Sequence, residues 1–323
     1  MVIADIITEF GAYYLAQGQN MTRIRQKLRR DLVTPQAFTT ILTDDTIWRA
    51  SEARHSRIVQ PFQKVFTPNG TTTLTPVEIR QYQMKADLVE SPDDLEATWL
   101  GFLASSNVKR TEWPFIRWWI ETQVIPQIQQ DIELNEIGAG VYAAPTPGTA
   151  GAAGTSMNGL QKTITDHITA GKIAPIALGA IPTADADFVT YLEQFHLGIS
   201  KAYRKIPMVV HMSEDLELKY KRGYRAKYSK DMDFADGGDG TKLVKYSNLT
   251  LQGLPSLNSK AGGADCNRIF ATPKENAILL MKKSQNMANF DLQPFDRTVK
   301  LLTDWWMGVG FVIPGIVFTN DQT

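Results

Sequence analysis

The stretch EIGAGVYAAPTPGTAGAAGTSMNGL, residues 136–160, divides the sequence into two parts of different character. Its middle, residues 138–157, consists mainly of glycine, alanine, proline and threonine, and only Val141, Tyr142 and Met157 supply bulk. A segment of this composition cannot bury enough apolar surface to order itself. We therefore expect it to form a connector or a loop that its surroundings hold in place.

A long amphipathic helix is predicted over residues 112–137, immediately before this connector. Apolar side chains recur there every three or four residues and would form one buried stripe. Pro126 lies inside the helix, where it should bend the axis or remove one backbone hydrogen bond. Gly138 and Gly140 supply the stop. The stripe consists of Trp113, Ile116, Trp118, Trp119, Ile120, Val124, Ile128 and Ile132.

A two-stranded ribbon is predicted over residues 57–89. Pro68-Asn69-Gly70 is a turn signal, because Asn-Gly accommodates positive φ. On the return arm apolar and polar residues alternate, which is the period of a strand with one buried face. A two-stranded ribbon is marginal by itself in water, so this one should pack either on its own domain or on a neighbouring subunit. The apolar residues of the return arm are Tyr82, Met84, Ala86 and Leu88.

The second half of the chain mixes helical and strand patterns, which indicates an α+β fold. Residues 297–321 are expected to form a long β-hairpin that turns near Met307-Gly308. The other predicted elements are a helix that starts at 91–95, an extended segment at 173–181, helices at 185–205 and 215–228, strands at 206–212 and 268–272, and a strand or short helix at 275–283.

The N-terminal segment, residues 1–32, has apolar residues at helical spacing. Its second half, MTRIRQKLRRDL at 21–32, carries five cations. These either face nucleic acid or an acidic partner, or they form a solvated helix face. The five cations are Arg23, Arg25, Lys27, Arg29 and Arg30.

Composition excludes several classes of protein. Lys plus Arg and Asp plus Glu each number 34, and this zero net charge argues against a dedicated nucleic-acid reader. Cys266 is the only cysteine, so no intrachain disulfide forms and a reducing compartment is expected. The longest apolar runs, such as 311–318, are far shorter than the roughly 20 residues of a membrane span. MVIADIITEF at the start has acids where a signal peptide needs an apolar core, so we expect an intracellular product.

No catalytic, metal or cofactor site is predicted. The sequence has no G-x-S-x-G, Walker or G-x-G-x-x-G motif. Residues 231–242 have some features of a calcium loop, but an acid is missing at the fifth position and Lys242 stands where a glutamate belongs. The four histidines show no metal-ligand spacing. They are His55, His167, His196 and His211.

The order of these elements resembles that of the major capsid proteins of tailed bacteriophages, which have the Hong-Kong-ninety-seven type of coat fold. The resemblance implies an N-terminal arm (1–56), an extended β-hairpin loop (57–91), a peripheral domain with a long spine helix (92–157 and 284–323) and an axial α/β domain (158–283). The similar stretches are PDDLEATW (92–99), EIGAG (136–140), NGLQKTI (158–164), MVVHMSEDLELKYKRGYR (208–225), QGLPSLNS (252–259) and RIFATPKENAILLMKK (268–283).

The resemblance implies a capsid protein rather than an enzyme. Such a protein self-assembles as hexamers and pentamers, in the host cytoplasm, into the icosahedral head of a virion around a dsDNA phage genome. The implied partners are further copies of the chain and packaged DNA, with portal, scaffolding or cement proteins as further candidates and no membrane. Only about 56 residues precede the ribbon, so a scaffold would be a separate protein or dispensable.

The resemblance also assigns roles to two sets of residues. The ribbon would lie over an adjacent subunit, and the basic segment would face the packaged DNA through Arg23, Arg25, Lys27, Arg29 and Arg30. The candidate inter-subunit contacts on the ribbon are Phe62, Phe66, Asn69, Gly70, Tyr82 and Met84.

Two other classes of protein are alternatives. An encapsulin is a bacterial compartment shell of the same fold that encloses cargo enzymes instead of DNA. The basic segment at 21–32 favours the phage protein, since a cargo shell has less use for one. The second alternative is a soluble α+β enzyme or binding protein, which would need a convergent polar pocket in a monomer.

Overall fold

The computed structural model describes residues 32–106, 109, 111, 114–228, 244, 247–283 and 290–323. The described residues form two compact units. Unit 1 holds residues 86–130 and 290–303, and unit 2 holds residues 32–85, 131–283 and 304–323. The basic segment at 21–32, except Leu32, and the stretch at 231–242 lie outside the described residues.

Unit 1 is built around the tryptophan-rich part of the predicted long helix. Trp118 and Trp119 are buried with Val124 and Leu301, so the apolar stripe forms the core of this unit, as its period indicates. The elements of unit 1 are α3 (Pro92–Ser106), α4 (Phe115–Trp119), the π-helical turn η2 (Ile120–Val124), most of α5 (Ile125–Asp131), β9 (Asp291–Phe295) and the first part of β10 (Thr298–Phe311).

The predicted long helix is confirmed as a continuous helical run from Phe115 to Ile137, which closes with a second π-helical turn, η3 (Ile132–Ile137). The disturbance expected at Pro126 takes the form of the π turn η2. There the N–H of Ile125 bonds the carbonyl of Ile120, five residues back. A proline ring clashes with the carbonyl four residues earlier, and a widened turn relieves that clash.

The first sheet has the strand order β1-β8-β10-β4, with β9 paired to the other end of β10. In unit 2 this sheet contains β1 (Thr39–Leu42), β8 (Ala277–Met281) and the last part of β10. Strand β8 runs parallel to β1 and antiparallel to β10. The fourth strand is β4 (Tyr82–Glu90). The strand alternative for 275–283 is therefore the correct one.

The predicted hairpin at Met307-Gly308 is wrong. Strand β10 runs without interruption from Thr298 to Phe311. The hairpin lies between β9 and β10, where Asp296 has a positive φ. Gly308 serves close packing instead of a turn, because a Cβ at this position would lie 2.2 Å from the carbonyl oxygen of Arg80.

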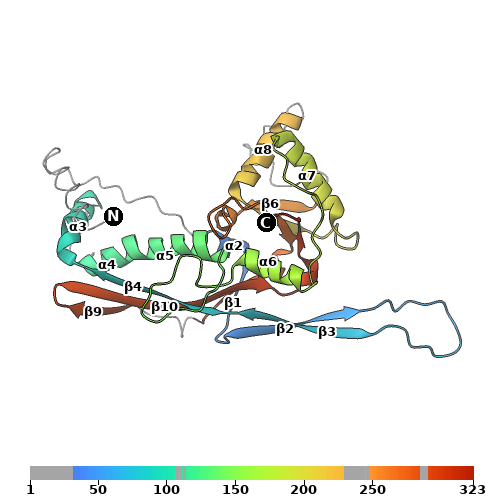
Figure 1. Ribbon diagram of the computed structural model, residues 1–323, viewed down its shortest axis with the longest axis horizontal. Coiled ribbons are helices and arrows are strands. Elements are labelled where there is room, and N and C mark those ends of the chain that lie inside the picture. The colour runs from blue at the N-terminus through green and yellow to red at the C-terminus, as the bar shows by residue number, and fades with distance from the viewer. Residues whose placement is uncertain are drawn as a thin grey trace. The chain divides into compact units, whose positions relative to one another are not determined.

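The second sheet has the order β11-β7-β5-β6 and carries an apolar core of unit 2. Helices α7 and α8 lie side by side over it (Figure 1), and Phe188, Leu192 and Tyr220 are completely buried there. The elements are α7 (Asp185–Gly198), β5 (Met208–Met212), α8 (Glu214–Tyr228), β6 (Leu249–Gly253), β7 (Phe270–Thr272) and β11 (Phe318–Thr319).

These elements confirm the predicted strands at 206–212 and 268–272 and the helix at 215–228, where the hydroxyl of Ser213 caps α8 by accepting from the N–H of Leu216 at 3.3 Å. Helix α7 ends earlier than predicted, at Gly198. The guanidinium of Arg204 folds back to bond the carbonyls of Leu197 and Ile199, which satisfies the end of the helix. Unit 2 also contains two short α-helices, α2 (Thr34–Ala37) and α6 (Leu160–Thr169).

Across the described part of the chain, no helix combines the length and the apolar character that crossing a bilayer requires.

Candidate interaction surface

The ribbon consists of β2 (Ile47–His55) and β3 (Thr72–Arg80), which pair from Ile47↔Arg80 to His55↔Thr72 and are joined by residues 56–71 (Figure 1). In the described chain these two strands form a sheet of their own. The predicted bounds of the ribbon, 57–89, are therefore wrong. The ribbon begins and ends earlier in the sequence, and the predicted return arm is β4, which belongs to the first sheet. The alternation in Val77-Glu78-Ile79-Arg80 was the signal for the true return strand.

The base of the ribbon is fixed to unit 2. Val77 and Ile79 are buried, and Ile79 packs with Ile278, Leu280 and Trp48. These contacts satisfy the inner face of the proximal half, so the first alternative, packing on its own domain, holds for the base of the ribbon.

Gln81 and Lys282 fix the direction in which the ribbon leaves the first sheet. The amide of Gln81 donates to the carbonyls of Thr43 at 3.0 Å and Asp45 at 3.1 Å, and Lys282 Nζ donates to the carbonyl of Asp44 at 2.7 Å. Three successive carbonyls of the β1–β2 connection are thus held by side chains. This arrangement lets the chain change sheets between β3 and β4.

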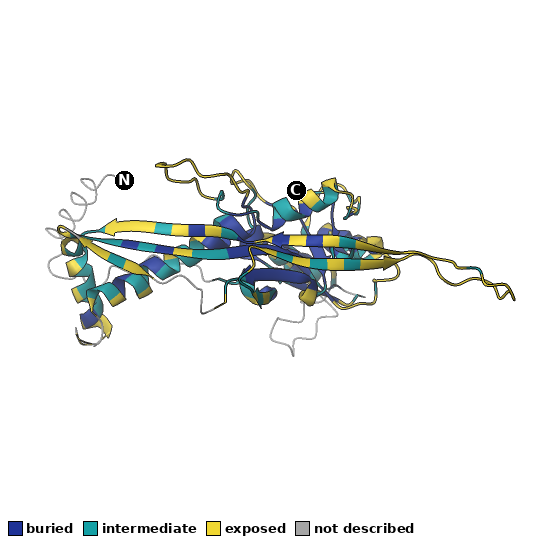
Figure 2. Cartoon of the chain, turned by 90° about the horizontal axis from the view of Figure 1, so that it is seen from below, coloured by how far each residue is buried: buried dark blue, intermediate teal, exposed yellow. Residues whose placement is uncertain are grey.

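The far end of the ribbon is apolar and uncovered. Phe62 is 92% exposed and Phe66 is 89% exposed, and Figure 2 shows the loop 56–71 and the adjoining strand ends as exposed. Burying a phenylalanine side chain stabilises by about 1.5–3 kcal/mol, so exposed apolar groups clustered here mark an interaction site. The other exposed apolar side chains of this end are Ile58, Val59, Val65 and Leu74.

Hydrogen bonds within the loop 56–71 shape it. Ser56 N donates to the carbonyl of Thr71 at 3.0 Å, which extends the strand ladder by one step. Gln60 donates to the carbonyl of Thr67 at 2.7 Å. Gly70 has φ 97°, as the turn signal predicts, but Asn69-Gly70 lies near the base of a long loop and is not a two-residue hairpin turn.

The six candidate contact residues separate into two groups. Phe62, Phe66, Asn69 and Gly70 lie in the exposed loop. Tyr82 and Met84 lie on β4, where they contact their own chain: Met84 is 5% exposed, and the Tyr82 hydroxyl accepts from Asn158 Nδ2 at 2.8 Å.

Burial raises the pKa of the half-buried Tyr82, whose ring also lies 4.8 Å from that of Tyr142. Met84 therefore presents little surface to another copy, and for the partly exposed Tyr82 the inter-subunit contact stays a prediction.

The soft connector 138–157 is fastened by its surroundings, as expected. Its two arms pair through Val141 N to the Gly154 carbonyl at 2.8 Å. The carboxylate of Glu136, at the end of the long helix, accepts from the N–H groups of Gly154 at 2.9 Å and Ser156 at 3.0 Å. The end of the long helix therefore holds the connector in place, while the outer residues of the connector, 143–151, remain exposed.

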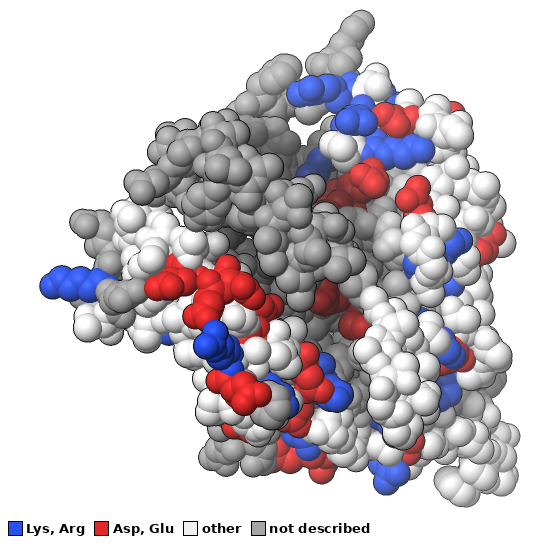
Figure 3. Space-filling model, turned by 60° about the vertical axis from the view of Figure 1, so that its left-hand side comes forward, with Lys and Arg blue, Asp and Glu red and all other residues white. Residues whose placement is uncertain are grey.

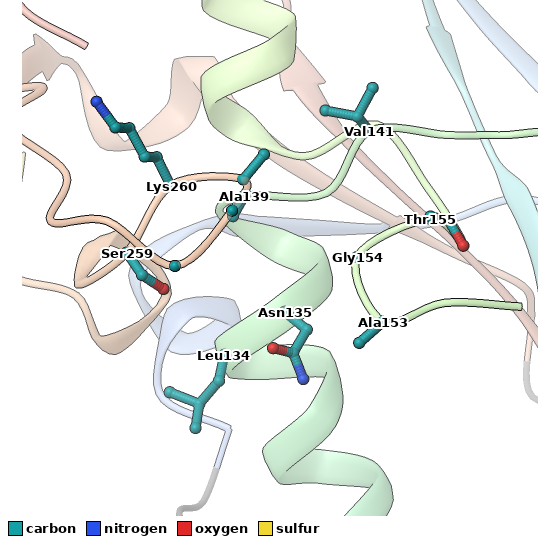
Figure 4. A pocket seen from close by; sticks show the side chains of 12 residues that line it. Leu134, Asn135, Ala139, Val141, Ala153, Gly154, Thr155, Ser259 and Lys260 are labelled. Atoms are coloured by element: carbon teal, nitrogen blue, oxygen red, sulfur yellow. The ribbon is translucent and has the colours of Figure 1, made fainter.

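A hollow of about 380 Å³ lies beside this connector (Figure 4). Small side chains such as Ala139, Ala153 and Thr155 line it, and Lys260 is its only ionisable residue. The hydroxyl residues Thr155 and Ser259 also line it, but no His, Asp, Glu or Cys that could act as a general base is among the lining residues.

The described residues contain no group of three His, Cys, Asp or Glu side chains that could hold a metal ion. His211 is completely buried between the rings of Phe38 and Phe270, and burial lowers its pKa to about 3. Both of its ring nitrogens lack a hydrogen-bond partner within the described chain. The basic candidates Arg23, Arg25, Lys27, Arg29 and Arg30 lie outside the described residues.

Comparison with known proteins shows similarity at the level of structure. The sequence matches no protein-family model and no curated protein. The fold is similar to that in the capsid of Myoviridae phage XM1, with a TM-score of 0.55, 10% identity and coverage of 93% of this chain and 94% of that one.

Two further structures are similar over nearly the whole chain. The procapsid of satellite phage P4, solved with its size-determination protein Sid, gives a TM-score of 0.52, 10% identity and coverage of 99% and 97%. The capsid of an empty GTA particle gives 0.51, 12% identity and 99% of both chains. The predicted fold is confirmed: this chain has the α+β fold of phage capsid proteins.

Proposed function

We propose that the protein is a major capsid protein, which assembles as hexamers and pentamers into the icosahedral head around a dsDNA phage genome. The observation that carries the proposal is the uncovered apolar loop 56–71 on a chain with a capsid fold. A cluster of exposed apolar side chains of this kind marks a surface that binds another surface. We assign that surface to a further copy of the same chain.

The ribbon suits head-to-tail contacts between copies. A heterologous contact closes into a ring when the rotation between copies allows it. Many modest contacts then become collectively tight, because each copy is held by several neighbours. Among the described residues β2 and β3 pair only with each other, so each has an outer edge that a neighbouring copy would protect.

The further parts of the proposal follow the family resemblance. The arm that precedes β2, the axial domain at 158–283 and the peripheral domain around the long helix take the roles that these regions have in capsid proteins. Within the arm, Arg23, Arg25, Lys27, Arg29 and Arg30 would contact packaged DNA without sequence specificity. The role is structural, and a portal, scaffolding or cement protein would act as an additional partner.

Electron microscopy of the purified full chain tests the proposal. Negative-stain images combined with size-exclusion chromatography are expected to show hollow shells or rings of subunits. A single species of about 36 kDa that persists at high protein concentration would overturn the proposal. Particles that contain a cargo enzyme and no nucleic acid after assembly in the native host would favour the encapsulin alternative.

A further inference from the structure

The free end of the ribbon is basic as well as apolar. From Ala53 to Val77 the sequence contains no Asp or Glu, and its cations are Arg54, Arg57 and Lys64. Arg54 is paired with Glu52 at 2.6 Å. Arg57 and Lys64 are exposed and form no ion pair with any described residue. The loop therefore presents two available cations beside its exposed phenylalanines.

Unit 1 presents a surface of the opposite charge. Residues 86–108 contain five acids and no Lys or Arg. Asp93 and Asp94 lie exposed in the first turn of α3, and Figure 3 shows acidic side chains, with some Lys and Arg among them, on the face that it turns forward. The five acids are Asp87, Glu90, Asp93, Asp94 and Glu96.

This acidic surface also carries exposed apolar side chains, and two of its carboxylates, those of Glu90 and Asp94, repel each other. Val89, 57% exposed, precedes Glu90, and Leu88 and Leu100 are partly exposed nearby in the sequence. Partial burial and the neighbouring charge of Asp94 raise the pKa of Glu90. A cation placed here would relieve the repulsion between these carboxylates.

A second cluster of exposed apolar side chains is a less suitable docking surface for the loop 56–71. Leu197, Tyr203 and Ile206 are exposed around the end of α7. They are interspersed with Lys201, Arg204 and Lys205, so this surface has the same charge sign as the loop 56–71. Juxtaposed like charges disfavour docking by several kcal/mol, which leaves the acidic surface around α3 as the complementary one.

We infer that the loop 56–71 of one copy docks on the acidic surface at residues 87–96 of a second copy, with Arg57 and Lys64 facing Asp93 and Asp94. Phe62 and Phe66 then cover the apolar groups around Val89. The inference rests on the proposed function and names the receiving surface for the ribbon. The apolar contacts supply most of the affinity, and the charges set the register and speed the encounter.

Charge reversal with rescue tests the pairing. R57E/K64E and D93K/D94K are each expected to lower the yield of assembled particles at least about tenfold, since reversal places like charges together. The chain that carries all four substitutions is expected to recover assembly, because each copy then presents an acidic loop to a basic surface. A defect in α3 itself would not be rescued by substitutions in the loop.

A matched control changes the same charges elsewhere. K201E/K205E and D265K/E275K alter exposed residues of unit 2 and should leave the yield of particles unchanged. Circular dichroism of every variant confirms that the chain is folded. Failure of the fourfold variant to assemble, while each control assembles, would overturn the inference.

Disulfide trapping identifies the partner. K64C/D93C under oxidation should give a ladder of chain multiples on a non-reducing gel, and K64C/D265C should give none. A faster-migrating single chain would place the contact within one molecule and overturn docking on a second copy.

The two proposals can fail separately. If the native chain forms no particles, the proposed function fails. If particles form and neither charge reversal affects them, the function stands and only this inference fails.

Discussion

The completely buried carboxylate of Glu133 accepts hydrogen bonds from the backbone N–H of Thr34 at 3.1 Å and from the hydroxyl of the same residue. The Thr34 hydroxyl also lies 2.8 Å from that of Ser256. One carboxylate thus joins the end of the long helix to α2, and through Ser256 to the segment after β6. A buried carboxyl group is tolerated only when hydrogen bonds satisfy it, so the donors on Thr34 hold the start of α2 against the end of the long helix.

Replacing Thr34 with Val should destabilise the protein by roughly 1–3 kcal/mol, because the buried Glu133 and Ser256 lose a partner while the shape is kept. Chemical unfolding followed by tryptophan fluorescence measures the change. Thr40→Val, on the exposed face of β1, is the matched control and should have little effect. Equal stability of the two variants would show that the junction contributes nothing.

His211 should make stability depend on pH. Its folded pKa of about 3 lies below the ordinary value of 6.5, so the unfolded chain binds the proton more tightly. The contribution is fully present above pH 6.5 and is lost as the pH falls toward 3, by roughly 1.4 kcal/mol per unit. Unfolding curves between pH 7 and pH 4 test this.

The control for this prediction compares two histidine variants. His211→Phe should flatten the decline below pH 6.5, whereas His55→Gln, at an exposed position on β2, should preserve it. A decline of the same steepness in the His211→Phe protein would assign the pH dependence to other groups.

Gly308→Ala should destabilise the sheet by about 1–3 kcal/mol, since the new methyl group would meet the Arg80 carbonyl at 2.2 Å and the backbone must shift. Thermal unfolding provides the measurement. Gly151→Ala is the matched control, because its Cβ would have only an ordinary contact at 3.6 Å with the Thr155 hydroxyl. If both variants melt at the native temperature, the close approach of β10 to Arg80 does not exist in solution.

F62S/F66S should abolish assembly and leave the stability of the single chain unchanged, because both rings are exposed before assembly and covered after it. Size-exclusion chromatography and unfolding curves give the two readouts. Leu197→Ser removes a similarly exposed apolar side chain at 60% exposure and should leave assembly intact if the effect is specific to the loop. Particles of normal size and yield from F62S/F66S would remove the loop from the assembly contacts.

Local patterns predicted the helices and several strands well. The apolar stripe around Trp118 and Trp119, the stop at Gly138 and the Ser213 cap all depend on residues within one or two helical turns of each other. Helical hydrogen bonds join residues four or five apart, so the information for them is contiguous in the chain. The soft composition of 138–157 likewise indicated correctly that an outside group must hold this loop.

Strand partners and the interaction surface were decided by the tertiary structure. Alternation in 82–88 predicted a strand with one buried face, of which Met84 is buried and Leu88 is exposed, but it did not show that β4 joins β10 or that the ribbon pairs β2 with β3. The pairing of a strand depends on which distant strand supplies the complementary edge. The alternation of apolar and polar residues along one strand does not identify that partner. For the same reason the sequence did not predict the roles of Met84, Gly308 and Glu136. Met84 was a candidate contact and is a core residue, Gly308 was expected in a turn and allows close packing, and Glu136 holds the connector.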